Sequence, residues 1–152
     1  MGAALIVVAL AVTACTDQQS RPGSSGTLDQ LVGVHWTLHE LHVGDRTIAV
    51  PPTISWFDLT TSYAVSGSDG CAHFQGQAHP TTDGLTISDL GMTASACLDQ
   101  SVLHQTRAAF RTVLDGRAVQ VRLVGSVLTL SAGTYVLSFE DGSPRASAAK
   151  SG

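Results

Sequence analysis

The amino-acid sequence predicts a mainly β fold of the α+β class. We expect an antiparallel sheet or a small barrel-like meander, with one packed helix at about residues 99–115. Three observations predict it: apolar residues alternate with period two over most of the chain, hairpin turn pairs separate the last strands, and one long segment has helical spacing. Strands do not alternate with helices, so a parallel sheet is not indicated.

The first predicted strand covers residues 34–43. It places Trp36 and Leu38 on one face and His35 and His39 on the other. Shorter runs of β-branched, aromatic and alternating residues predict the remaining strands. These lie at residues 53–57, 63–65, 71–79, 85–88, 117–124, 127–132 and 135–140.

The segment 99–115 breaks the period-two pattern. Its apolar residues recur every three or four positions, which predicts a helix with a single apolar stripe. Asp99 suits the N-cap, and Gly116 suits the end of the helix. Gly125-Ser126 and Gly133-Thr134 then fit tight turns between the last three strands.

The N-terminal segment resembles a bacterial lipoprotein signal. The apolar run from Ala3 to Val12 is too short to span a bilayer but has the length of a signal core. Val12-Thr13-Ala14-Cys15 reads as a lipobox, so we expect cleavage before Cys15 and lipidation of its thiol. The first five residues lack the usual Lys or Arg, which leaves open an upstream start or a weak signal. The alternative is a buried N-terminal strand with a chance cysteine.

This interpretation divides the chain into four parts. Residues 1–14 form the lipoprotein signal peptide, and residues 15–27 carry the lipidated cysteine and a flexible tether rich in Ser and Gly. Residues 28–141 form the folded domain, and residues 142–152 form a disordered tail. The expected location is extracytoplasmic, with the cell membrane as partner through the lipid on Cys15.

Two cysteines remain, Cys71 and Cys97, 26 residues apart. Outside the cytoplasm, a lone pair in a small domain usually forms a disulfide. Closing such a loop contributes about 3–4 kcal/mol in the chain-entropy model. Two buried free thiols are the alternative. A reactive redox pair is less favoured, because the sequence has no Cys-x-x-Cys motif.

The spacing of three histidines suggests a metal site, but the predicted strand argues against it. His35, His39 and His42 would share one face of a helix, but this segment alternates as a strand. On a strand, His35 and His39 lie about 13 Å apart. One zinc ion with ligands about 2 Å away cannot hold both. We therefore expect solvated histidines, no metal and no cofactor.

Composition disfavours several other classes. The formal net charge is −4, and Lys and Arg do not cluster, so nucleic acid is not an expected partner. Gly67-Ser68-Asp69-Gly70 is not a nucleophile elbow and fits a turn better. The sequence contains no phosphate-binding glycine loop. We do not expect an enzyme.

The aromatic residues are spread over many predicted elements, which is typical of a core. An alternative is an apolar cleft for a lipid or peptide inside the β structure. Its candidate ligand-binding residues are Trp36, Phe57, Phe74 and Phe110.

Three stretches together resemble the META domain, the fold of HslJ-like heat-shock lipoproteins. Residues 31–38 (LVGVHWTL) are similar to the family's Leu-x-Gly-x-x-Trp-x-Leu. Residues 67–76 (GSDGCAHFQG) are similar to Gly-x-x-Gly-Cys-Asn-x-Phe-x-Gly, and residues 90–97 (LGMTASAC) to Leu-x-Met-Thr-x-Met-Ala-Cys. The chain departs from these motifs at Ala72, where the family usually has Asn, and at Ser95, where it usually has Met.

The resemblance implies a β-rich domain with one helix, with Cys71 and Cys97 close enough to bond. It also implies roles in envelope stress, antibiotic tolerance or secretion, with no general catalytic activity. We therefore expect a lipid-anchored protein that acts by binding in envelope maintenance or stress tolerance. The alternatives are a carrier of a small apolar ligand, or an inhibitor or adaptor that docks a protein partner through residues 42–52.

Overall fold

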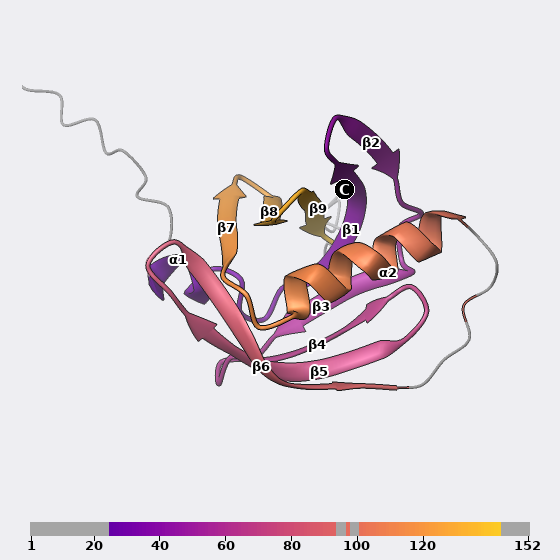
Figure 1. Ribbon diagram of the computed structural model, residues 1–152. Coiled ribbons are helices and arrows are strands. Elements are labelled where there is room, and N and C mark those ends of the chain that lie inside the picture. The colour runs from indigo at the N-terminus through magenta and orange to yellow at the C-terminus, as the bar shows by residue number, and fades with distance from the viewer. Residues whose placement is uncertain (1–24, 94–96, 98–100, 144–152) are drawn as a thin grey trace, which may run out of the picture.

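The computed structural model describes residues 25–93, 97 and 101–143. In this part of the chain, antiparallel strands form one sheet that closes on itself, and helix α2 crosses it (Figure 1). The predicted fold class is therefore confirmed. The elements are α1 (Ser25–Asp29), β1 (His35–Val43), β2 (Arg46–Ala49), β3 (Ser55–Leu59), β4 (Ala64–Asp69), β5 (His73–Pro80), β6 (Gly84–Met92), α2 (Ser101–Leu114), β7 (Val119–Val124), β8 (Val127–Ala132) and β9 (Tyr135–Asp141).

The ring of strands runs β1-β3-β4-β5-β6-β7-β8-β9 and returns to β1. The β1–β9 ladder closes it, from Trp36 opposite Asp141 to Val43 opposite Tyr135. Strand β2 lies outside the ring, because it pairs with the second half of β1 beyond the β3 pairing. Closure removes the free edges that an open sheet would expose.

A bulge in β1 explains where its predicted alternation ends. The β1–β9 register shifts between Leu38 and Glu40. Trp36 and Leu38 are buried before the bulge, and Leu41 is buried after it, so the inward face moves from even to odd positions. Thr37, on the outer face, is nevertheless buried, because Gly142 lies against it.

Helix α2 supplies the centre of the core. Its buried residues follow the predicted stripe, and its Phe110 ring meets Phe74 of β5 at 5.6 Å and Phe139 of β9 at 6.0 Å. Phe139 also packs edge-to-face on Phe57 of β3, with ring centroids 5.0 Å apart. Such pairs add about 0.5–1.5 kcal/mol each beyond area burial. Gly116 has φ +72°, which fits its predicted position after the helix.

Several predicted boundaries were wrong. Strand β4 continues to Asp69, so Gly67 and Ser68 belong to a strand and the turn falls at residues 70–72. Strand β6 extends to Met92, and β2 was not predicted as a strand. Gly76 coincides with a register shift in the β5–β6 ladder, which accounts for the interruption seen in the sequence.

Ordered contacts also lie just outside the expected bounds of the domain, residues 28–141. Helix α1 begins at Ser25, inside the predicted tether 15–27. The Tyr63 hydroxyl donates to Asp29 Oδ1 at 2.6 Å, and this hydrogen bond raises the phenol pKa above its ordinary value. At the other end, the Gly142 N–H donates to the His35 carbonyl at 2.7 Å, so the predicted tail 142–152 starts as ordered backbone beside β1.

Gly67 allows the sheet to pass under an aromatic ring. It is paired with Phe74 across the β4–β5 ladder, and a Cβ at Gly67 would collide with the Phe74 ring and the Trp56 carbonyl oxygen. Gly91 of β6 offers a contrast, because a Cβ there would meet only Gln75 side-chain atoms at ordinary contact distance, 3.6 Å or more.

We predict that Gly67→Ala lowers the free energy of unfolding by about 1–3 kcal/mol or more, since it overpacks a filled position. Gly91→Ala should change it by no more than about 0.5 kcal/mol. Urea unfolding of both variants measures the difference. Equal stabilities would show that Phe74 does not lie over Gly67.

Candidate functional site

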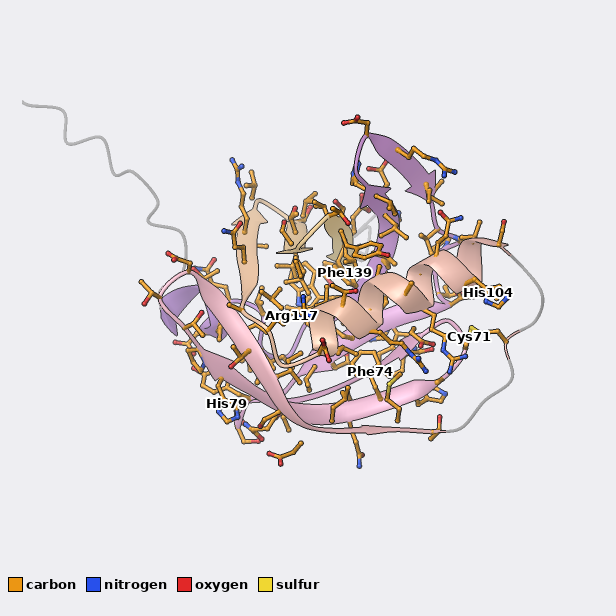
Figure 2. All side chains as sticks on the ribbon, viewed as in Figure 1. Cys71, Phe74, His79, His104, Arg117 and Phe139 are labelled. Carbon is orange, nitrogen blue, oxygen red and sulfur yellow. A yellow bond between two sulfur atoms is a disulfide. The ribbon has the colours of Figure 1, made fainter. Side chains whose placement is uncertain are left out.

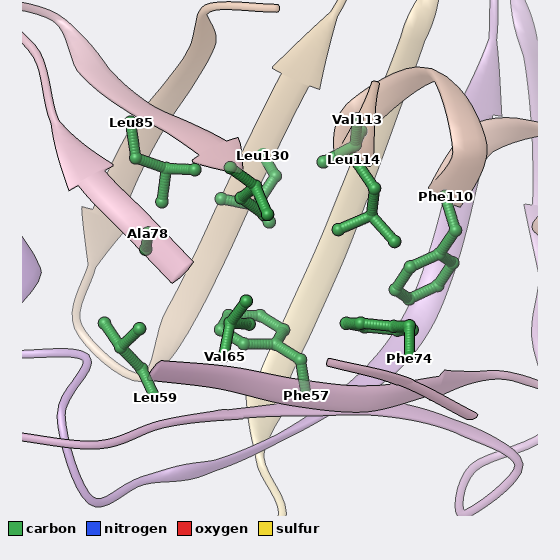
Figure 3. A pocket seen from close by; sticks show the side chains of 11 residues that line it. Phe57, Leu59, Val65, Phe74, Ala78, Leu85, Phe110, Val113, Leu114 and Leu130 are labelled. Atoms are coloured by element: carbon green, nitrogen blue, oxygen red, sulfur yellow. The ribbon is translucent and has the colours of Figure 1, made fainter. Parts of the chain in front are cut away.

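The interior of the closed sheet is nearly filled. Figure 3 shows a small cavity in this interior with only apolar side chains around it. Its volume is about 20 Å³. That is room for about one water molecule, which would find no polar partner there. The lining residues are Phe57, Leu59, Val65, Phe74, Ala78, Leu85, Ile87, Phe110, Val113, Leu114 and Leu130.

The four candidate ligand-binding residues do not form a common cleft. Phe57, Phe74 and Phe110 line the small cavity, whereas Trp36 does not. Trp36 is 3% exposed, and its indole Nε1–H donates to the Leu31 carbonyl at 3.2 Å. These aromatic side chains fill the core, and the space between them is far too small for a lipid chain.

Cys71 and Cys97 form a disulfide, with Cα atoms 5.0 Å apart. Cys71 follows β4, and Cys97 lies in the connection between β6 and α2. Both residues are half-buried. The bond joins these segments just beyond the end of the β5–β6 ladder, where Phe74 lies opposite Met92.

A buried carboxylate organises the turn that presents Cys71. Asp69 is fully buried, and its Oδ1 accepts hydrogen bonds from the backbone N–H groups of Cys71 at 2.8 Å and Ala72 at 2.7 Å. Gly70, which lies between Asp69 and Cys71, has φ +93°, a conformation that favours glycine. The turn geometry and the position of the Cys71 sulfur thus depend on the Asp69 side chain.

Arg107 of α2 connects this turn to the disulfide. Its Nε lies 3.8 Å from Asp69 Oδ2, and its Nη1 donates to Cys97 Sγ at 3.5 Å. Within the described chain, Arg107 Nε, Asp69 Oδ2 and the buried Ser55 Oγ have no hydrogen-bond partner. A buried carboxylate is stable only with a compensating charge, so the long Arg107–Asp69 ion pair matters to folding. Figure 2 labels Cys71 beside α2.

A second cluster lies on the outer face of the sheet. We call it the Trp56 face: His35 of β1, Trp56 and Asp58 of β3, and His73 of β5. The Trp56 ring lies 5.1 Å from the His35 ring and 6.2 Å from the His73 ring. His35 Nδ1 is 2.8 Å from Asp58 Oδ1. Trp56 is half-buried and points away from the core, so this face combines an accessible aromatic ring with ionisable groups.

We expected solvated β1 histidines, but each of them is paired with a carboxylate. Besides the His35 pair, His39 Nε2 lies 3.4 Å from Glu140, and His42 Nε2 lies 3.5 Å from Glu40. Each histidine has a different acidic partner. In the described part of the chain, no three His, Cys, Asp or Glu residues converge as a metal site would require.

His79, Ser88 and Asp89 form a hydrogen-bonded chain between β5 and β6. The Ser88 hydroxyl donates to Asp89 Oδ2 at 2.9 Å, and His79 Nε2 lies 2.7 Å from the same hydroxyl. The single hydroxyl proton points to Asp89, so His79 is the donor to Ser88. A catalytic histidine would accept that proton instead.

Two predicted sites remain: the lipidation site near the N-terminus and the docking segment 42–52 at the edge of the sheet. Cys15, the signal peptide 1–14 and most of the tether lie outside the described residues. In residues 42–52, strand β2 forms the outer edge of the sheet and pairs with β1 alone.

None of the described helices has both the length and the apolar character needed to cross a membrane.

A closed antiparallel sheet with helix α2 packed against its core, and with a disulfide between Cys71 and Cys97, defines the class of this domain. Comparison with protein families finds a match to the META domain over residues 29–143. The chain therefore belongs to the META domain family, as the sequence motifs predicted.

Two solved structures share the fold. An NMR structure of a protein from Burkholderia xenovorans has a TM-score of 0.62 and 19% identity, with 95% of this chain and all of that chain covered. A second NMR structure has a TM-score of 0.57 and 22% identity, with 74% of this chain and 92% of that chain covered. No curated protein gives a significant match.

Sequence reasoning missed the residues that organise both clusters. Asp69 was interpreted as an ordinary turn residue, Arg107 was not singled out, and Trp56 was counted with the core. The alternation of β3 contained a signal for Trp56, since Phe57 and Leu59 occupy its inward positions.

We predict that Asp69→Ala destabilises the protein by about 3–5 kcal/mol, because it leaves Arg107 without its counter-charge and two backbone N–H groups without their acceptor. Asp115→Ala serves as the control, since Asp115 pairs with Arg117 on the surface. Its effect should stay within about 0.5 kcal/mol. Thermal and urea unfolding measure both, and similar losses would remove Asp69 from its organising role.

Proposed function

We propose that this protein is a lipid-anchored extracytoplasmic binding protein, without catalytic activity, that supports envelope maintenance or tolerance of stress and antibiotics. The lipobox at Cys15 and the META domain support this class. The anchor holds the domain near the membrane surface through a short tether.

One observation favours binding on the outside of the domain. The interior cavity measures about 20 Å³, which argues against the carrier of an apolar ligand. The Trp56 face, by contrast, offers a partly exposed indole beside His35 and His73, with Asp58 close by. Exposed aromatic and ionisable side chains on a rigid sheet are typical of binding surfaces.

A second possibility is an adaptor that docks a protein partner at β2. This strand stands at the outer edge of the sheet, and its Arg46, Thr47 and Ala49 are exposed. An extended segment of a partner could add to such an edge.

Complementation of a deletion strain tests the proposal under envelope stress, with the mature protein analysed by mass spectrometry. We predict that the wild-type chain begins at a lipid-modified Cys15 and restores tolerance. Cys15→Ser should lose both the lipid and the tolerance. Trp56→Ala should keep the lipid and lose tolerance, while Val124→Ala, at a residue 60% exposed on β7, should keep both.

Full tolerance with Cys15→Ser would contradict the role of the anchor. Full tolerance with Trp56→Ala, together with loss in Arg46→Glu, would replace the Trp56 face with the β2 edge as the binding surface. Each variant must first show the unfolding midpoint of the wild type to within a few degrees.

A further inference from the structure

We propose that the Cys71–Cys97 disulfide is a site of thiol–disulfide exchange, in which a thiol attacks Cys71 and Cys97 is the leaving group. The partner is a dithiol, either a small molecule or the active site of a dithiol protein. This inference concerns chemistry that neither the family nor the proposed binding role assigns.

The two sulfur atoms have different surroundings. Arg107 Nη1 donates to Cys97 Sγ at 3.5 Å, whereas the residue beside Cys71 is the acidic Asp69. A nearby guanidinium stabilises a thiolate, and a stabilised thiolate leaves faster in exchange. The negative charge that develops on breaking the bond is therefore favoured on Cys97.

The fold holds Arg107 in this position. Its Nε faces the buried Asp69 Oδ2 at 3.8 Å, so the guanidinium is oriented with Nη1 toward the disulfide. Asp69 is itself fixed by the N–H groups of Cys71 and Ala72. In a Cys-x-x-Cys motif, the helix that carries the motif stabilises the thiolate. Here the Arg107 guanidinium of α2 is placed to do so.

The disulfide is also accessible. Cys71 and Cys97 are both half-buried, and Cys71 follows a tight turn at Gly70. Arg107 and Asp69 are charged groups that contact the junction. His73, two residues beyond Cys71, has its ring near Trp56 on the outer face.

The exchange balances in two steps. A thiolate of the dithiol attacks Cys71 Sγ, the mixed disulfide bond forms, and the electron pair of the broken bond leaves on Cys97. The second thiolate of the dithiol then attacks the first sulfur of the same dithiol, which is bonded to Cys71. The mixed disulfide breaks and releases Cys71 as a thiolate. The protein gains two electrons and two protons, and the dithiol becomes a disulfide.

The first test uses the full chain with Cys15→Ser, so that only two cysteines remain. Glutathione is the probe, and the mixed disulfide is located by peptide mass mapping. We predict glutathione on Cys71. Its presence mainly on Cys97 would overturn the proposal.

The second test compares rates of reduction by dithiothreitol. Arg107→Gln should slow reduction about threefold or more, since the leaving thiolate loses its cation. Arg111→Gln, four residues later on an exposed position of α2, should leave the rate unchanged. Equal rates in the two variants would overturn the proposal.

A third measurement guards against misfolding, because Arg107→Gln leaves Asp69 unpaired. The double variant Asp69→Asn/Arg107→Gln keeps a neutral pair of similar shape, and its disulfide should be reduced as slowly as that of Arg107→Gln.

A further measurement follows the free Cys97 thiol in Cys71→Ser. The pH midpoint of its reaction with iodoacetamide should lie about one pH unit below the ordinary 8.5. A midpoint at 8.5 would contradict the inference.

Discussion

The pairing of β1 with β9 is the constraint on which the rest of the structure depends. These strands lie at opposite ends of the domain sequence, and their ladder is the contact that turns a meander into a closed ring. Leu38 and Phe139 face each other in this ladder and are completely buried. Without the pairing, two long edges and the aromatic core around Phe110 would meet water.

Closure also determines where function can reside. Once the ring closes and α2 packs its apolar stripe against it, phenylalanine and aliphatic side chains occupy the interior, and the apolar cavity among them is smaller than any lipid or peptide. Outside this apolar interior lie the Asp69–Arg107 junction at the disulfide and the Trp56 face. The rigid ring positions both: the junction by α2 and the end of β4, and the Trp56 face by β1, β3 and β5.

Local patterns in the sequence were enough for the fold class, the α2 stripe and the last three strands, because each depends on residues close together in the chain. The family motifs indicated the Cys71–Cys97 bond. What could not be predicted depends on distant pairings. Arg107 meets Asp69 only after α2 folds onto β4, and strand β2 is an edge because β1 is its only partner in the sheet. The bulge at residues 38–40 likewise has no signature in its own side chains.

Amide hydrogen exchange in β1 and β9 tests the closed ring most directly. If the ladder closes the sheet, we predict that the protected amides of these two strands exchange only through global unfolding, with the same free energy as those of β4 and β5. Faster exchange of β1 and β9 through local opening, while β4 and β5 stay protected, would contradict the account. The interior would then be open to ligands, and the case for binding on the outer surface would fail.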